Sequence, residues 1–223
     1  MSRDLTFARP LILLGAGGHA KVVLSLARAA GWAMLGVCDP ELARQGVREW
    51  RGLRVLGGDQ ALADVDPADV GLLNGIGQVM GGGARQRLFD ELAPRNFRFP
   101  VLVHPAASVD PTATLGDGVQ VMAGAIVQAD TRIGQNTIVN TRASVDHDCV
   151  IGSHAHIAPG ATLCGAVHVE GGAFVGAGAT VVQGLRIGSL AFVAAGAVLI
   201  RDLGERQRWP SVELANDSQR SHS

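Results

Sequence analysis

The stretch from Val103 to Leu199 repeats every six residues, and this repeat decides the fold. Each sixth residue in it is aliphatic, with no slip in phase: Val103, Val109, Leu115, Val121, Val127, Ile133, Val139, Val145, Ile151, Ile157, Leu163, Val169, Val175, Val181, Ile187, Val193 and Leu199. A small residue usually stands two positions earlier, as Ala125 and Ala161 do. Glycine recurs at a step of three hexads, as at Gly134 and Gly152. A hexapeptide period of this kind predicts a parallel β-helix.

The physical reason for the prediction is that three flat sides of about six residues close into a triangular coil. One aliphatic side chain per side then points inward, and equivalent positions in successive coils stack about 4.8 Å apart. Small residues and glycine are expected where the chain turns a corner. No coil can bury its aliphatic residues alone, so the coils fold only as a stack. The length of the repeat predicts about five to six coils.

Residues 1–100 have a different pattern, with short apolar runs alternating with helical periodicity. We expect strands at Leu11–Leu14, Ala33–Val37, Gly52–Leu56 and Val70–Ile76, and helices at Ala20–Ala30, Ala61–Val65 and Gln86–Leu92. Short continuous apolar runs are typical of buried parallel strands. The order predicts a βαβαβ unit, a small doubly wound α/β domain of the half-Rossmann kind. We therefore divide the chain into this domain (1–100), a β-helix domain (101–203) and a C-terminal tail (204–223).

Composition limits the classes of partner and the compartment. The net charge is −1 and the pI about 6.6, so nothing in the overall charge favours nucleic acid or an anionic membrane surface. The three cysteines, Cys38, Cys149 and Cys164, contain no CxxC pair and form no disulfide framework. No uncharged apolar stretch is long enough to span a membrane. These features predict a cytoplasmic protein without a membrane span.

The first strand runs into a glycine turn, Gly15-Ala16-Gly17-Gly18-His19, and a helix follows. A turn of this kind brings backbone N–H groups and a helix N-terminus to a phosphate. Asp39 ends the second strand, where an acidic residue can contact a ribose. The domain is only half a dinucleotide fold, which favours a mononucleotide or a nucleotide-sugar over NAD. The alternative is a tight turn that binds nothing, with His19 simply exposed.

Within the repeat, the polar segment 140–156 stands out from plain apolar coils. His147 comes two residues after the inward-facing Val145, so its ring should point outward, and Asp148 is its neighbour. An adjacent carboxylate raises the basicity of an imidazole and fixes its tautomer, as a general base requires. The alternative is a solvated surface histidine. Zinc would need His147, His154 and His156 to converge, but their spacing places them on different sides of a coil, so no metal is expected.

Several motifs, in this order, resemble the hexapeptide sugar acetyltransferases of the NeuD and PglD type. They are Gly15-Ala16-Gly17-Gly18-His19, His104-Pro105, Asn140-Thr141, Asp146-His147-Asp148-Cys149-Val150-Ile151-Gly152 and Gly176-Ala177-Gly178-Ala179. The family includes sialic acid O-acetyltransferases and enzymes that N-acetylate nucleotide-linked 4-amino-4,6-dideoxy sugars. The resemblance implies a left-handed β-helix, a homotrimer with active sites between subunits, acetyl-CoA as co-substrate, and a nucleotide-sugar held by the N-terminal domain.

The resemblance also implies roles for individual residues. His147 is expected to be the general base and Asp148 the acid that makes it more basic. The binding residues it implies are Gly17, Gly18, His19 and Asp39 for the nucleotide-sugar, Asn140 for the acceptor sugar, His156 and Gly165 for the thioester end of acetyl-CoA, and Ala177 and Ala195 for the pantetheine arm. The sequence departs from the family at Arg208-Trp209-Pro210-Ser211, where relatives carry a Gly-Val-Pro-Ala segment before a basic residue.

The activity implied is acetyl transfer from acetyl-CoA to the 4-amino group of a UDP- or GDP-linked 4-amino-4,6-dideoxy sugar, in bacterial surface glycan or glycoprotein synthesis. His147 would act by direct attack of the amine on the thioester, without an acetyl-enzyme. Two alternatives remain open from the sequence. One is O-acetylation of sialic acid or another sugar, and the other is a non-catalytic protein that binds nucleotide-sugars.

Overall fold

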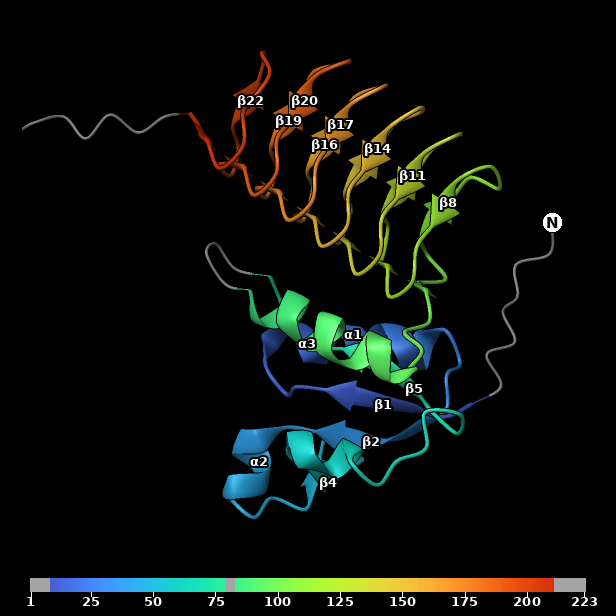
Figure 1. The fold of residues 1–223 in the computed structure, drawn as a ribbon. Coiled ribbons are helices and arrows are strands. Elements are labelled where there is room, and N and C mark those ends of the chain that lie inside the picture. Colours follow the sequence, from blue (N-terminus) through green and yellow to red (C-terminus); the bar gives the residue numbers. More distant parts are fainter. Residues whose placement is uncertain (1–8, 79–82, 211–223) are drawn as a thin grey trace, which may run out of the picture.

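The structure is a computed structural model that describes residues 9–78 and 83–210. Figure 1 shows an α/β domain at the N-terminal end and a prism of stacked coils that follows it. The part of the predicted tail from residue 211 onward lies outside the described residues.

The prism is a left-handed parallel β-helix whose three faces are parallel sheets, here called C, D and E. Sheet C contains β6 (Leu102–Val103), β9 (Gln120–Val121), β12 (Ile138–Val139), β15 (His156–Ile157), β18 (Phe174–Val175), β21 (Phe192–Val193) and β23 (Arg208–Trp209). Sheet D contains β7 (Ser108–Val109), β10 (Ile126–Val127), β13 (Ser144–Val145), β16 (Thr162–Leu163), β19 (Thr180–Val181) and β22 (Val198–Leu199). Sheet E contains β8 (Thr114–Leu115), β11 (Arg132–Ile133), β14 (Val150–Ile151), β17 (His168–Val169) and β20 (Arg186–Ile187).

The hexad aliphatic is the second residue of each strand and points into one continuous core. Equivalent positions pair one coil apart, as Val127 pairs with Val145 and Val145 with Leu163. Cys149 is buried in the same core, as expected of an apolar filler. The ladder also continues past the predicted boundary at residue 203. β23 pairs with β21, so the last strand of the prism lies in the segment assigned to the tail.

The corners are not restricted to the glycine and small residues that the sequence analysis predicted. Every sixth residue from Gly118 to Gly196 has a positive φ, and non-glycine residues such as Asp148 occupy half of these positions. The glycines that recur every three hexads have another reason to be small. A Cβ on Gly152 would lie 2.6 Å from the backbone nitrogen of Gly171 in the next coil. Glycine is therefore required at this position by the close approach of the next coil, and not by a left-handed backbone conformation.

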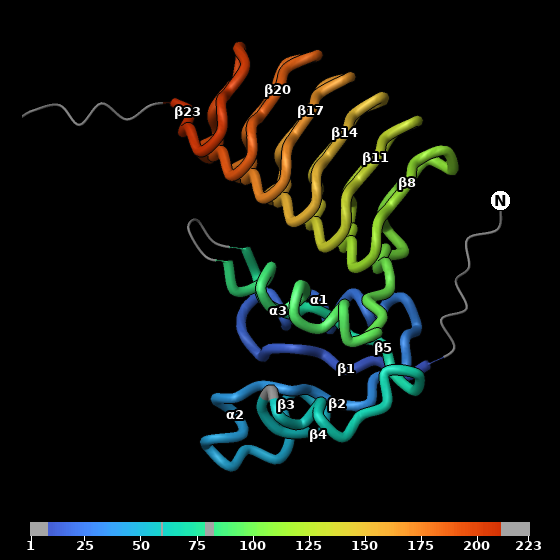
Figure 2. The backbone as a smooth tube through the Cα atoms, viewed as in Figure 1, coloured from blue at the N-terminus to red at the C-terminus, as the bar shows by residue number. Residues whose placement is uncertain are grey.

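The N-terminal domain is a five-stranded sheet of order β3-β4-β2-β1-β5, with helices beside it (Figure 2). Its elements are β1 (Leu11–Leu14), α1 (Gly18–Ala29), β2 (Met34–Cys38), α2 (Pro40–Arg44), β3 (Glu49–Trp50), β4 (Leu53–Gly57), η1 (Asp59–Leu62), β5 (Gly71–Asn74), α3 (Ala84–Leu92) and η2 (Ala93–Arg95). The predicted helix at Ala61–Val65 is a 3₁₀ turn that begins earlier. The short helix α2 was not predicted, although Asp39 caps it and Pro40 is its first residue.

The domain docks on the N-terminal end of sheet C, and this interface is called the seam. Leu102, Met122 and Ile138 of the prism share one buried apolar cluster with β1 and α1. Helix α3 lies along the same side of the prism (Figure 1). A glycine turn at the carboxyl end of β1 is thereby fixed relative to the β-helix. Among the described helices, none has the length and apolar character needed to cross a membrane.

Candidate active site

His147 lies on the corner between sheets D and E, outside the prism. Val145 points into the core, and the turn that follows carries the imidazole outward, where 60% of the side chain is exposed. Nδ1 of His147 lies 2.7 Å from Oδ2 of Asp148. That hydrogen bond, together with the charge of Asp146, raises the pKa of His147. Because the carboxylate accepts the Nδ1 proton, Nε2 is left as the basic atom.

Nε2 of His147 faces Gly165, which occupies the equivalent corner one coil further along. A Cβ placed on Gly165 would lie 2.6 Å from that nitrogen, so only glycine leaves the ring where it is. We call Asp146, His147, Asp148 and Gly165 the corner cluster.

Gly165→Ala should therefore reduce kcat by about a hundredfold, because a displacement of the base by about 1 Å costs that much in a positioned reaction. The fold should survive, since the backbone of Gly165 does not have a positive φ. Steady-state kinetics and a thermal melt measure the two effects separately. Gly171→Ala is the matched control, because a Cβ there would meet its nearest atom at an ordinary 3.4 Å. Equal losses in both variants would contradict the role of the glycine.

A second group of predicted residues meets at the seam. The amide nitrogen of Asn140 lies 3.1 Å from Nε2 of His156, and its oxygen accepts the backbone N–H of Thr141. Nε2 of His19 lies 2.9 Å from Oε1 of Gln120, which projects from sheet C. We call His19, Gln120, Asn140 and His156 the seam cluster. The glycine turn of one domain and the outer face of the other contribute to it jointly.

Both histidines of the seam cluster are neutral. Burial lowers the pKa of His19 to about 4, and the positive charge of Arg85 acts in the same direction. Burial also lowers the pKa of His156 to about 4, with contributions from His19 and Arg85, while the Gln78 backbone acts in the opposite direction. These rings therefore offer hydrogen-bonding atoms at neutral pH and no charge.

The remaining residues expected to bind the nucleotide-sugar lie beside His19. Gly17 and Gly18 are exposed at the start of α1, and a Cβ on either would meet no atom within 4 Å. Their backbone is therefore open to a ligand. Asp39 has structural partners, because its carboxylate accepts the N–H of Ala16 at 2.8 Å and that of Leu42 at 2.9 Å. It holds the glycine turn against α2.

Ala177 and Ala195 occupy the corner between sheets C and D, one coil apart, and both are exposed. Their side chains end at Cβ, so the backbone of this corner can be approached by a slender chain such as pantetheine. Asn140 lies on the same corner, two coils before Ala177. His147 and Gly165 lie on the next corner, with the face of sheet D between the two. Among the described residues no hydrogen bond or ion pair joins the corner cluster to the seam cluster.

The three histidines considered for a metal have separate partners. His154 lies 3.0 Å from Nδ2 of Asn136 and 3.6 Å from Oδ1 of Asp90, away from His147 and its aspartate. Within residues 9–78 and 83–210, no group of histidine, cysteine, aspartate or glutamate is arranged to hold a metal ion.

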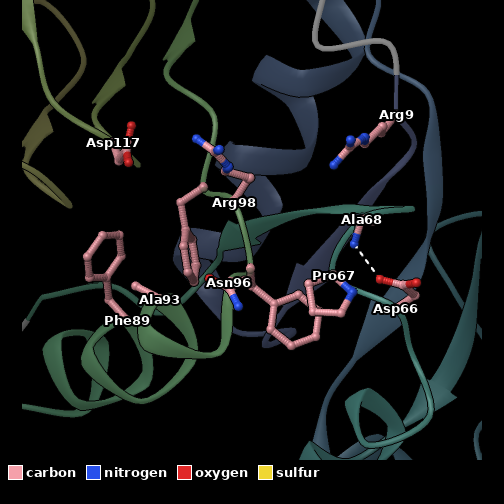
Figure 3. Close-up of a pocket in the computed structure, with 11 residues that line it drawn as sticks. Arg9, Asp66, Pro67, Ala68, Phe89, Ala93, Asn96, Arg98 and Asp117 are labelled. Carbon is pink, nitrogen blue, oxygen red and sulfur yellow. Dashed lines mark hydrogen bonds between the residues drawn. The ribbon is translucent and has the colours of Figure 1, made fainter.

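A cavity of about 520 Å³, drawn in Figure 3, has lining residues that precede β1 and β5, whereas the glycine turn follows the other end of β1. Arg9, Arg98, Asp66 and Asp117 line it, together with aromatic rings. Two positive and two negative side chains balance there, and Asp66 already accepts the N–H of Ala68. None of the predicted site residues lines this cavity, so we do not place the chemistry in it.

Two polar residues important at the seam were missed by the sequence analysis. Gln120 and Arg85 are each 2% exposed, although nothing in their sequence context distinguishes them from surface residues. Gln120 occupies an outward position of its hexad, where a polar residue is ordinarily solvated. The one feature of the sequence that could have indicated their burial is that a second domain precedes the prism and must pack against one of its faces.

A β-helix with an exposed imidazole–carboxylate pair, preceded by half a Rossmann domain, defines a hexapeptide-repeat transferase. Residues 10–92 match the family model of the PglD N-terminal domain, and residues 130–165 match that of the bacterial transferase hexapeptide (six repeats). The chain belongs to the hexapeptide-repeat sugar acetyltransferases of the NeuD/PglD type. It is an acyltransferase, a sugar N-acetyltransferase whose acetyl donor is acetyl-CoA.

Two solved structures support this membership. PerB from Caulobacter crescentus, in complex with CoA and GDP-perosamine, is 37% identical, with a TM-score of 0.80 over 88% of this chain and 91% of that chain. The acetyltransferase domain of PglB from Neisseria gonorrhoeae FA1090, in complex with acetyl coenzyme A, is 35% identical, with a TM-score of 0.82 over 90% of this chain and 95% of that chain. WeeI from Acinetobacter baumannii AYE, at 22% identity and a TM-score of 0.79, shares the fold. Among curated proteins, no sequence matches this chain significantly.

Proposed function

We propose that this enzyme acetylates the 4-amino group of a UDP- or GDP-linked 4-amino-4,6-dideoxy sugar, with His147 as the general base. The observation that carries the proposal is the geometry of His147, whose Nδ1 is held by Asp148 while Nε2 remains available. The relative PerB, which is in complex with GDP-perosamine, makes a nucleotide-linked amino sugar the best-supported acceptor class.

Acetyl-CoA supplies an acetyl group activated as a thioester. The residues of this chain supply a base and hold the two substrates in position. Nε2 of His147 accepts the proton that the amine loses as its nitrogen attacks the thioester carbonyl carbon. The C–S bond then breaks, and coenzyme A leaves as the thiol with a proton returned from the imidazolium. Asp148 holds the imidazole in the required tautomer and stabilises its protonated form. Gly165 leaves the space in front of Nε2 unobstructed. No covalent acetyl-enzyme is needed, since orientation of two bound substrates lowers the barrier substantially.

The acceptor is proposed to bind along the seam. Its nucleotide would lie on the open backbone of Gly17 and Gly18 at the start of α1, where N–H groups favour phosphate oxygens. Its amino sugar would extend to Asn140, whose amide nitrogen lies 3.1 Å from Nε2 of His156, the residue predicted to line the thioester end of acetyl-CoA. The coenzyme would follow the corner that carries Ala177 and Ala195.

The corner cluster lies between sheets D and E, whereas the seam cluster lies on sheet C and at its corner with sheet D, so we propose that a homotrimer completes each site between neighbouring subunits. The face of sheet D that separates the corners is uncharged at its outward positions, which are Ser108, Ile126, Ser144, Thr162, Thr180 and Val198. A flat, uncharged face suits packing against a second copy of the chain. In that arrangement His147 of one subunit meets the seam cluster of the next.

Two assays test the function. Thiol release from acetyl-CoA should require a UDP- or GDP-linked 4-amino sugar, while free or CMP-linked sialic acid should give none. Turnover of sialic acid instead would contradict the proposed acceptor and show that the enzyme O-acetylates a sugar. For the shared site, His147→Ala and Asn140→Ala subunits are mixed and reassembled in equal amounts. About a quarter of the sites then combine two intact halves, so activity should return to about that fraction. No recovery in mixed trimers would place the whole site within one chain.

Asp148→Asn should move the acidic limb of the kcat/KM profile to lower pH and reduce the plateau about tenfold. Asp148 raises the pKa of His147, so its loss lowers that pKa and frees the base at lower pH. Asparagine tolerates the positive φ of this position, so the corner should keep its shape. The profile is measured from pH 5 to 9 with the acceptor below its KM. A limb that stays in place or moves to higher pH would exclude His147 as the titrating group.

A further inference from the structure

Gln120 connects the glycine turn to a buried polar network that crosses the seam. Its amide nitrogen donates to the backbone oxygen of Asn74 at 2.9 Å, and its oxygen faces Nε2 of His19 at 2.9 Å. The side chain is 2% exposed, so it cannot exchange these partners for water. Because the Asn74 oxygen can only accept, the orientation of the Gln120 amide is fixed.

The network is anchored on the far side by Arg85, which is also 2% exposed. Its guanidinium donates to the backbone oxygens of Asn74, Ile76 and Asn136 at 2.9 to 3.2 Å. The Asn74 side chain in turn donates to the backbone oxygen of Arg85. These bonds join β5, α3 and a prism corner, so Gln120 meets a rigid acceptor at Asn74.

A fixed amide oxygen determines the tautomer of His19. Oε1 of Gln120 is an acceptor only, so Nε2 of His19 must carry the proton that it donates. In a neutral ring, Nδ1 is then a lone-pair acceptor. Among the described residues Nδ1 has no hydrogen-bond partner, and it is not one of the buried unpartnered atoms of the protein. It is therefore open to a ligand beside Gly17 and Gly18.

We propose that Gln120 is a positioning residue that holds His19 as the Nε2–H tautomer, so that Nδ1 accepts a hydrogen bond from a hydroxyl or amino group of the substrate. His19 would then not serve as a cation for the diphosphate. The identity of the ligand in this inference rests on the proposed function. The tautomer of His19 does not depend on that function.

Burial and the charge of Arg85 lower the pKa of His19, whereas its hydrogen bond with Gln120 raises that pKa. Arg85 is a positive charge on α3 that has no carboxylate among its hydrogen-bond partners, and the neighbouring His156 on β15 is uncharged at neutral pH. The charge of Arg85 lowers the tendency of His19 to take up a proton, in addition to its burial. An imidazolium at this position would add a second buried positive charge beside the first, which is costly without a counter-ion.

The first experiment reads the tautomer directly, by ¹⁵N–¹H correlation spectra of the histidine rings at pH 7. The His19 signals are assigned from their loss in His19→Gln. We expect a protonated Nε2 and an unprotonated Nδ1, both in the free protein and with saturating UDP or GDP. An Nδ1–H tautomer in the free protein, or conversion to imidazolium when the nucleotide is added, would overturn the proposal. Neither reading depends on whether the protein turns over any sugar.

The second experiment uses Gln120→Met and Gln120→Glu. Methionine removes both hydrogen bonds at similar length, and should release His19 into a mixture of tautomers and raise the KM of the amino sugar about tenfold, with the KM of acetyl-CoA unchanged. Glutamate should favour the imidazolium, in which Nδ1 donates, so the KM of the amino sugar should rise as the pH falls from 8 to 6. A cation for phosphate predicts the opposite sign, tighter binding at low pH. That result, or equal changes in both KM values, would remove Gln120 from the positioning role.

Discussion

His147→Ala should lower kcat by about two to four decades while the protein still binds acetyl-CoA. The substitution removes Nε2, the proposed proton acceptor, and leaves the prism intact, because the ring projects from an exposed corner. The coenzyme is proposed to follow the corner that carries Ala177 and Ala195, so its affinity should change little. Turnover is measured by thiol release and affinity by calorimetry.

His168→Ala is the matched control. His168 is also a histidine on the outside of the prism, on β17, and its ring nitrogen lies 3.2 Å from the backbone oxygen of Ala166. It has no carboxylate partner among the described residues, so its loss should leave kcat unchanged. Turnover of His147→Ala within tenfold of the unaltered enzyme would mean that another group removes the proton.

The repeat predicted the prism because one position in six is controlled by burial alone. Once Val145 is placed in the core, the phase of the hexad carries His147 outward without further information. The same phase places Gly165 one coil beyond it. The βαβαβ order of the first domain followed from equally simple signals, apolar strands and a glycine turn.

The seam could not be predicted in this way, since it depends on how two domains pack. Gln120 and Arg85 look like solvated residues when each element is considered alone, and both are buried only by docking. Asp39 is a further residue whose structural partners were not predicted. Its position predicts a ribose contact, which stays a prediction, and the structure adds a role that the sequence did not indicate, because its carboxylate accepts two backbone N–H groups. Local patterns indicate which residues can do chemistry, but the partners they meet are set by tertiary packing.

Acidification from pH 7.5 to 5 should destabilise the protein strongly through the two histidines of the seam cluster. The pKa of each is lowered to about 4 in the folded state, against about 6.5 in the unfolded chain. The unfolded state therefore binds more protons, so stability is complete above pH 6.5 and declines as the pH falls towards 4. At pH 5 the loss is roughly 2 kcal/mol for each histidine, or about 4 kcal/mol for the pair.

The loss is measured by urea unfolding at fixed protein concentration and ionic strength, in steps between pH 7.5 and 5. His156→Gln and His19→Gln should each flatten the dependence by about half, because each removes one group that must take up a proton on unfolding. His168→Ala should leave it unchanged, since that ring is partly exposed and makes no contact with the seam cluster. If only carboxylates caused the destabilisation, the loss of stability would begin near pH 5 and would be the same in all variants. A dependence that persists in the double variant would mean that burial at the seam does not keep these rings neutral, and the basis for treating them as uncharged hydrogen-bonding groups would be lost.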